Sequence, residues 1–220
     1  MLLYFKKILC ELISFSFIKT LIFNLHYFGL KGLTFPVIIG KRFKLRLLQG
    51  TVTIPDKLEH KIYLGKNDFG WMNGIGTWKN KGHIHFEGSA YIGNGTRISV
   101  DHDAHLYLGD KLYCSGNALI SCDKMISIGD DSMLSWNVTI MDNDAHKIMD
   151  ASNTIYNFPK DIHIGSHVWI GCDSHILKGS SIPNGSIVAA ASTISKSFSK
   201  ENILLGETNR ILKEGVFWKP

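Results

Sequence analysis

The sequence is poor in cysteine, and its few cysteines form no pattern typical of disulfides. Four occur among 220 residues, and no two of them make a CxxC pair. A disulfide framework needs a higher density, and most structural zinc sites need closely paired cysteines. The four are Cys10, Cys114, Cys122 and Cys172. We therefore expect a reduced, cytoplasmic compartment.

The chain also lacks a long uncharged hydrophobic run and a strong charge bias. The N-terminal segment 1–30 is apolar, but four charged residues interrupt it: Lys6, Lys7, Glu11 and Lys19. A membrane-spanning helix is therefore not expected, and no small-residue cleavage site indicates a signal peptide. The net charge of +5, from 24 Lys and Arg against 19 Asp and Glu, is too weak and scattered to favour nucleic acid binding.

Apolar residues of the N-terminal segment recur at helical spacing, for example Leu2, Phe5, Leu9 and Leu12. This periodicity predicts one or two amphipathic helices. Two locations fit such a helix. It packs against the rest of the chain or a partner subunit, or it lies in a membrane interface. The second location would give a peripheral contact of residues 1–30 at the inner face of the membrane.

A six-residue repeat dominates the C-terminal half of the chain. β-branched aliphatic residues recur at every sixth position: Ile164, Ile170, Ile176, Ile182, Val188 and Ile194. Small residues follow most of them in a constant phase: Val168, Ser174, Ser180, Ser186 and Ser192. Neither the helical period of 3.6 nor the strand alternation of 2 explains this pattern over thirty residues.

A chain that turns after every six residues does explain the repeat. Each hexad supplies a short strand with one inward aliphatic side chain, and three hexads close a triangular coil. Successive coils then stack at about the strand spacing of 4.8 Å and form parallel sheets. We predict an all-β solenoid over 51–198, an N-terminal helical and strand extension over 1–50, and a cap formed by a turn and a short helical or irregular tail over 199–220.

Two segments interrupt the repeat, DHDAH at 101–105 and a longer one that begins with DNDAH at 142–146. Loops that leave a solenoid without breaking it are typical places for function. The hexads around them, IGSHVWIGCDSHILKGSSIPNGSIVAAASTISKSF above all, resemble the hexapeptide-repeat acyltransferases over roughly residues 84–215. The resemblance is nearest to the O-acetyltransferases of polysaccharide and lipopolysaccharide gene clusters, with galactoside and maltose acetyltransferases more distant. It implies a left-handed parallel β-helix and a homotrimer.

The resemblance also implies an acetyl-CoA-dependent O-acetyltransferase that acts on a saccharide, free or lipid-linked, without a metal. The run IGDDSMLSWNVTIMDNDAH resembles the family's catalytic motif, which ends in histidine, so His146 is the expected general base. An imidazole is suited to accept a hydroxyl proton near neutral pH. Asp142 or Asp144 would orient the ring, as a carboxylate does in a hydrolase triad. His105 is the alternative base, because DHDAH closely repeats DNDAH.

The same resemblance implies which residues contact acetyl-CoA, the acetyl donor; we call these the donor side. Trp169 corresponds to a tryptophan near the family's active site, and the backbone N–H of Cys172 to the donor that polarises the thioester carbonyl. A backbone donor makes no demand on the thiol, so no covalent cysteine mechanism is expected. The positions that match coenzyme contacts are Ala190, Ser195, Lys196, Arg210 and Lys213. The last two lie in GETNRILK, where Thr208 and Asn209 replace the family's Pro-Ala.

On the acceptor side, Asp123 corresponds to a sugar-contacting acid of the family, and Ser115 or Asn117 to a nearby polar contact. Two other functions remain open at this point. One is a zinc-dependent hydratase on the same scaffold, with histidines from adjacent subunits as ligands; the candidates are His102, His105, His146, His163 and His167. The other is a non-catalytic β-helix scaffold.

Overall fold

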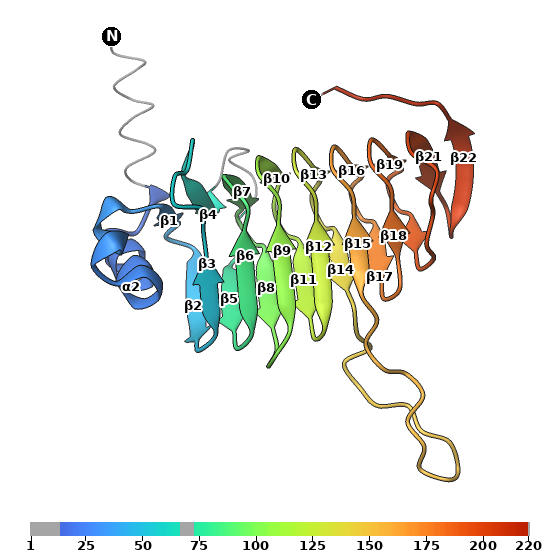
Figure 1. The fold of residues 1–220 in the computed structure, drawn as a ribbon, viewed down its shortest axis with the longest axis horizontal. Helices are drawn as coiled ribbons and strands as arrows, with labels where there is room; N and C mark the ends of the chain where they lie inside the picture. The colour runs from blue at the N-terminus through green and yellow to red at the C-terminus, as the bar shows by residue number, and fades with distance from the viewer. Residues whose placement is uncertain (1–13, 67–72, 220) are drawn as a thin grey trace.

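The computed structural model describes residues 14–66 and 73–219, and in it the chain winds into a triangular prism (Figure 1). Three sheets form the faces of the prism, and successive coils pair their strands in parallel from the first coil to the last. The fold predicted from the sequence, a left-handed parallel β-helix with an N-terminal helix and a C-terminal cap, is confirmed.

Each face takes one strand from each turn of the chain. The nine-stranded sheet contains β1 (Val37–Ile39), β4 (Ile62–Lys66), β7 (Ala90–Gly93), β10 (Leu112–Cys114), β13 (Met133–Leu134), β16 (Trp169–Ile170), β19 (Ile187–Val188), β21 (Ile203–Gly206) and β22 (Arg210–Glu214). The seven-stranded sheet contains β2 (Phe43–Leu48), β5 (Gly76–Asn80), β8 (Arg97–Val100), β11 (Leu119–Cys122), β14 (Thr139–Met141), β17 (His175–Leu177) and β20 (Thr193–Ile194). The six-stranded sheet contains β3 (Thr51–Thr53), β6 (His83–Phe86), β9 (His105–Leu108), β12 (Met125–Ile128), β15 (Ile162–Ile164) and β18 (Ser181–Ile182).

The strand register confirms that three hexads make one coil. Ile164 pairs with Ile182, Ile170 with Val188, and Ile176 with Ile194, so each partner lies 18 residues further along the chain. All six side chains are at most 3% exposed. Burial of each such side chain stabilises the fold by about 1.5–3 kcal/mol, so the stacked aliphatic columns are the main source of its stability.

The small residues of the repeat lie inside the corners of the coil. Ser174 and Ser180 are at most 1% exposed. Their hydroxyls donate to the carbonyl oxygens of Ala189 at 3.0 Å and Ile194 at 2.9 Å. An apolar side chain at these two positions would leave the carbonyl oxygens without that donor. Serine therefore adds a hydrogen bond at these two corners, while the buried Val168 shows that the same phase of the repeat also accepts an apolar side chain.

The helix α2 (Phe17–Phe28) and the 3-10 helix η1 (Gly29–Thr34) cover the first coil (Figure 1). Phe23 packs edge-on against Trp78 at 5.1 Å between ring centroids, and the Asn24 side chain bonds both the N–H and the C=O of Val37. The predicted N-terminal helix is thus confirmed for its described part, while residues 1–13 lie outside the described residues. No helix within 14–66 and 73–219 is long and apolar enough to cross a membrane.

The C-terminal tail covers the opposite end of the prism. β21 continues the parallel stack beyond β19, and β22 then folds back antiparallel beside β21. The tail is therefore a β-hairpin, not the turn with a helical or irregular segment that the sequence suggested. The reason is that a strand at the end of a stack has unpaired N–H and C=O groups, and an added antiparallel strand satisfies them.

Candidate active site

The predicted site residues gather on two different edges of the prism. We call the corners that follow the nine-stranded sheet, at 115–118, 135–138, 171–174 and 189–192, the first edge. The corners that follow the seven-stranded sheet, at 101–104, 123–124, 142–161, 178–180 and 195–197, are the second edge. The first edge carries Ser115, Asn117, Cys172 and Ala190, and the second carries Asp123, Asp142, Asp144, His146, Ser195 and Lys196.

The seven-stranded sheet separates the two edges of one chain. From Cys172 on the first edge to Lys178 on the second, the chain runs six residues through β17, which is roughly 15–20 Å for extended backbone. A single prism therefore does not bring its first-edge and second-edge residues into one site. Ser195 and Lys196, predicted to act beside Ala190, lie on the edge of His146 instead.

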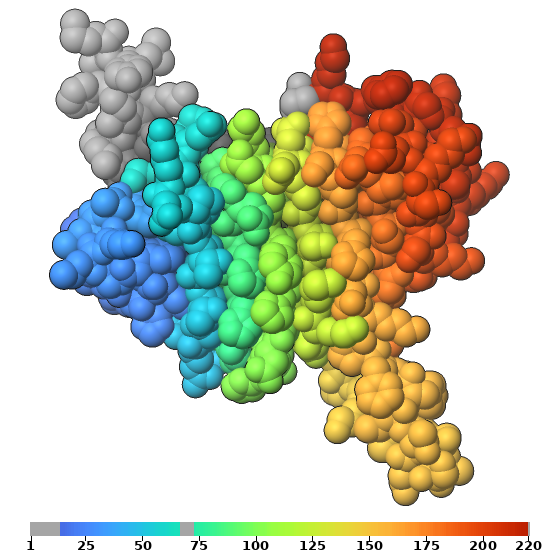
Figure 2. Space-filling view, in the orientation of Figure 1, coloured from blue at the N-terminus to red at the C-terminus, as the bar shows by residue number. Residues whose placement is uncertain are grey.

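His146 lies in the segment 142–161, which projects away from the prism between β14 and β15 (Figures 1 and 2). The residue is exposed. Its backbone is fixed, because its N–H donates to the Asp144 carbonyl at 2.7 Å and its C=O accepts from the Asn157 amide at 2.8 Å. Among the described residues the imidazole ring has no hydrogen-bond partner, so its nitrogens face solvent and remain open to a substrate.

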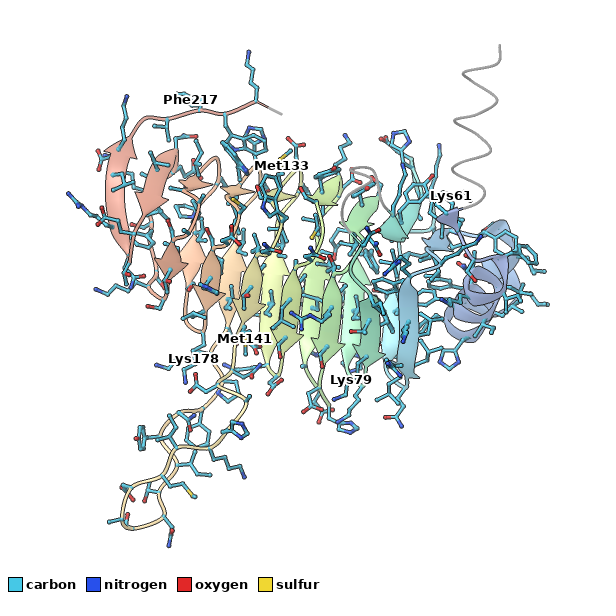
Figure 3. All side chains as sticks on the ribbon, turned by 180° about the vertical axis from the view of Figure 1, so that it is seen from behind. Lys61, Lys79, Met133, Met141, Lys178 and Phe217 are labelled. Atoms are coloured by element: carbon cyan, nitrogen blue, oxygen red, sulfur yellow. The ribbon has the colours of Figure 1, made fainter. Side chains whose placement is uncertain are left out.

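Asp144 fastens the base of this segment to the next coil. Its carboxylate accepts hydrogen bonds from the ammonium of Lys178 and, at 2.8 Å, from the side-chain amide of Asn157. The hydrogen bond from Lys178, followed by that from Asn157, lowers the pKa of Asp144 below the ordinary carboxyl range. Figure 3 shows Lys178 and Met141 at the point where the segment leaves the prism, and β14 and β17 pair there.

Asp142 is fully buried and acts within the corner itself. Its two carboxylate oxygens accept the backbone N–H groups of Asp123 and Lys124, both at 2.8 Å, and Asn143 donates to it at 3.1 Å. The structure thus gives both candidate partners of His146 other partners. It brings neither Asp142 nor Asp144 to the imidazole ring, and the sequence prediction of an orienting carboxylate has no counterpart in this conformation.

The donor-side residues line the first edge and the adjoining part of β16. Trp169 is 37% exposed and its indole N–H donates to the Ser135 hydroxyl at 3.1 Å. The Cys172 carbonyl accepts from the N–H of Ala191 at 2.8 Å, while the Cys172 N–H has no backbone partner within the described ranges. Burial, together with Asp173, raises the pKa of the Cys172 thiol, which disfavours the thiolate that a nucleophile would need.

Gly171 explains how the corners of the first edge come so close. A Cβ atom on Gly171 would lie 2.6 Å from the backbone nitrogen of Ala190, closer than carbon and nitrogen atoms approach without a bond. Only glycine lets the Cys172 corner pack directly under the exposed Ala190 corner. The result is a strip of small residues where these two corners meet: Gly171, Cys172, Ala189, Ala190 and Ala191.

The predicted phosphate contacts lie in the C-terminal hairpin. Arg210 and Lys213 are exposed residues of β22, and the Arg210 guanidinium is paired with Glu207 at 3.2 Å. Asn209 connects this hairpin to the second edge, because it accepts from the Ser195 N–H at 2.7 Å and donates to the Ser195 hydroxyl at 2.9 Å. The Asn209 that departs from the family pattern therefore has a structural role.

On the acceptor side the structure separates the three predicted residues. Asp123 lies one coil away from Asp142 on the second edge, and burial, with Asp142 and Asp101, raises the pKa of its carboxyl group. Ser115 and Asn117 lie on the first edge instead, with Ser115 6% exposed and Asn117 in a left-handed conformation (φ 53°). Within one chain they do not join Asp123.

Sequence reasoning missed Lys178 and Asn157. Lys178 follows Leu177, which pairs with Met141, so the repeat phase alone places it beside the start of the 142–161 segment. Asn157 belongs to a segment without a repeat, and nothing in the sequence indicates its two hydrogen bonds. The metal alternative gains no support in residues 14–66 and 73–219, where no group of three His, Cys, Asp or Glu side chains could hold an ion.

Comparison with known proteins confirms the resemblance to O-acetyltransferases. No model of a protein family matches the chain. It is 28% identical over 119 residues to the galactoside O-acetyltransferase of Escherichia coli (strain K12), covering 53% of this chain and 58% of that enzyme. It is 36% identical over 87 residues to the polysialic acid O-acetyltransferase of Neisseria meningitidis, covering 39% of this chain and 40% of that one. The chain thus spans about half the length of these two relatives.

The chain also matches a solved structure in its fold. The polySia-specific acetyltransferase NeuO matches with a TM-score of 0.56 and 22% identity, over 84% of this chain and 79% of that chain. At this identity the match concerns the fold only.

Proposed function

We propose that the protein is an O-acetyltransferase that moves an acetyl group from acetyl-CoA to a saccharide hydroxyl in the biosynthesis of a surface polysaccharide. The single observation that carries this proposal is the arrangement of the predicted residues along two exposed edges. One edge offers a strip of small residues with a backbone N–H, that of Cys172, which has no backbone partner in the described part of the chain, and the other offers an imidazole open to solvent. The O-acetyltransferases among the relatives support the reaction class.

The residues of the two edges divide the chemistry between them. The unprotonated nitrogen of His146 takes the proton of the acceptor hydroxyl as the hydroxyl oxygen attacks the thioester carbon. The N–H of Cys172 donates to the carbonyl oxygen, which becomes negatively charged as the new C–O bond forms. When the C–S bond breaks, the sulfur leaves as a thiolate and accepts the proton held by His146. No bond to the protein forms in this sequence.

Binding both reactants on rigid edges supplies the rest of the catalysis. The 142–161 segment is anchored by Asp144, Lys178 and Asn157, so His146 is held at a fixed height along the stack. The thioester arm would lie on the strip at Ala190, with Arg210 and Lys213 placed for the phosphates. Holding two reactants in register converts a bimolecular step into an effectively unimolecular one.

We further propose a homotrimer as the active species. The two edges flank the seven-stranded sheet, so three copies with these sheets toward a common axis would place the first edge of one copy beside the second edge of the next. The outer face of this sheet carries the half-buried apolar side chains of Leu119, Met141 and Leu177, which suit an interface. Ser115 and Asn117 would then approach the Asp123 of a neighbour.

The test is a transfer assay with purified full-length protein. Radiolabelled acetyl-CoA is incubated with a panel of saccharides, including sialic acid polymers and galactosides, and the acetylated product is identified by mass spectrometry. We expect the reaction to take place in the cytoplasm and to need no metal, so transfer should persist after dialysis against a chelator. Light scattering should give three times the chain mass of 24.7 kDa, as expected for a trimer. Absence of transfer to every saccharide, with no binding of acetyl-CoA, would contradict the proposal and favour a scaffold.

A further inference from the structure

The helix α2 presents an apolar face to solvent. Ile18, Ile22 and Leu25 follow one another at i, i+4 and i+7 and therefore share one face of the helix. They are 69%, 50% and 39% exposed, whereas Phe23 and Asn24 on the opposite face are fully buried. The helix thus has one face bound to the prism and a second apolar face that no described element covers.

Further exposed apolar side chains lie at the start of the helix and in the segment after it. Leu30 and Leu33 of η1 are 84% and 52% exposed, and Phe17 at the start of α2 is 67% exposed. Exposed apolar side chains that gather on one short segment are typical of interaction sites. We call these six side chains the N-terminal patch: Phe17, Ile18, Ile22, Leu25, Leu30 and Leu33.

Basic residues predominate in the segment that carries the patch, and Asp56 and Glu59 line the hollow that Lys31 also lines. Residues 12–55 contain no Asp or Glu but include six basic residues: Lys19, Lys31, Lys41, Arg42, Lys44 and Arg46. The Lys19 ammonium donates to the carbonyls of Lys41 at 2.7 Å and Phe43 at 3.0 Å, which holds the basic turn against the first turn of α2. Lys31 lies exposed within η1. The patch therefore has positive charge at both ends.

We propose that the N-terminal patch is a docking surface for an anionic phospholipid bilayer. An apolar helix face flanked by basic residues lies in the plane of a membrane, with its apolar side chains at the boundary between headgroups and acyl chains. Each lysine or arginine near the surface adds attraction to anionic headgroups. An apolar protein partner would not require the excess of basic residues in this segment, and a second copy would bring these like charges together.

The location of the patch fits this role. α2 lies at one end of the prism and β22 at the other (Figure 1). The 142–161 segment leaves the prism between β14 and β15, away from α2, so a membrane at the α2 end would not cover it. If the proposed trimer forms with parallel prisms, three patches face the same way, and three weak contacts act together. This last step depends on the proposed function, whereas bilayer binding by the patch does not.

Sedimentation with vesicles tests the proposal. The full-length protein is mixed with vesicles of phosphatidylcholine alone, or with about a third of phosphatidylglycerol, and the bound fraction is measured at ~0.1 M and ~0.5 M salt. We expect binding to the anionic vesicles that weakens at the higher salt. Ile22→Glu should reduce the partition coefficient at least about tenfold, because it replaces a membrane-inserted side chain with a charge.

The matched control is Ile211→Glu, which makes the same substitution at a 40% exposed isoleucine of β22, and it should bind vesicles as the unaltered chain does. Ile18→Glu serves as a second patch variant, and circular dichroism verifies that each variant is folded. Transfer to a soluble saccharide should be equal in the two patch variants and the unaltered chain, which separates this proposal from the proposed function. Unchanged vesicle binding in both patch variants, no binding of the unaltered chain, or a smaller oligomer in Ile22→Glu would overturn it.

Discussion

The carboxylate of Asp144 is bound to the ammonium of Lys178, 34 residues further along the chain and one coil along the stack. Asn157 donates to the same carboxylate and to the carbonyl of His146. Two residues outside the repeat and one at its corner thus hold the segment that carries the candidate base. The segment is anchored by polar contacts and contributes little to the core.

Removing one partner of this contact should loosen the segment without unfolding the prism. We expect Lys178→Met to increase hydrogen exchange of the 142–161 amides about two- to fivefold, the range for a partly exposed ion pair. The matched control is Lys200→Met, which removes the Lys200–Glu214 pair at the far end of the prism. Equal exchange in the unaltered chain and Lys178→Met would show that the ion pair does not hold the segment.

The same contact gives the segment a defined pH dependence. Since the pKa of Asp144 is lowered in the folded protein, its contribution is complete above the ordinary carboxyl pKa of about 3.9. The contribution is lost as the pH falls through the lower folded value. Exchange of the 142–161 amides, corrected for intrinsic rates, should therefore rise in this acid range, and Asp144→Asn should abolish that rise.

Asp142 should prove structural. Asp142→Ala leaves the buried N–H groups of Asp123 and Lys124 without their acceptor, and we expect the free energy of unfolding to fall by about 2–3 kcal/mol. Glu59→Ala, at an exposed carboxylate, is the control. Urea denaturation measures both. A variant with unaltered stability but no transfer activity would instead assign Asp142 a role in the reaction.

His146→Ala should lower kcat about 100- to 10,000-fold, because general base catalysis contributes that much. The dissociation constant of this variant for acetyl-CoA, measured by calorimetry, should stay within about threefold of that of the unaltered chain, because no contact with the coenzyme is lost. His105→Ala is the matched control. His105 lies on β9 of the six-stranded sheet, its ring stacked with those of His83 and His85, and its loss should leave kcat unchanged. The reverse result would make His105 the base.

Charge reversal in the C-terminal hairpin should weaken the binding of acetyl-CoA, the acetyl donor. We expect Arg210→Glu or Lys213→Glu to raise the KM for acetyl-CoA about tenfold or more, since a hydrogen bond between charged groups contributes about 1.5–3 kcal/mol. The kcat should change little. Lys111→Glu alters an exposed lysine in the turn before β10, away from the hairpin, and should not change the KM for acetyl-CoA. An unchanged KM in both hairpin variants would remove them from the phosphate site.

The repeating coils and the N-terminal helix could be predicted from the periodicity of the sequence, whereas the C-terminal hairpin and the contacts of the 142–161 segment could not. The six-residue spacing from Ile164 to Ile194 predicts the triangular coil, because each face of the prism needs one inward aliphatic side chain. The β22 strand depends on the unpaired edge of β21, which no local pattern reveals. The contacts of Asn157 depend on how a segment without a period folds back.

Assignment of the site residues to edges required the register. Ser195 follows Ile194, and Ile194 pairs with Ile176 of the seven-stranded sheet, so Ser195 belongs to the second edge. Ala190 follows Val188 of the nine-stranded sheet and belongs to the first. The family resemblance predicts a role for each residue but not the chain from which it acts, since a trimer can complete a site with residues of two copies.

The most direct test of a site shared between copies is a mixed trimer. His146→Ala removes the base on the second edge, and Ala190→Trp blocks the strip on the first edge, so each variant alone should be inactive. Co-expressed, the two chains should regain a substantial fraction of the unaltered activity, because some interfaces pair an intact first edge with an intact second edge. Mixed oligomers, verified by mass spectrometry, that remain as inactive as either parent would contradict a site formed by two chains.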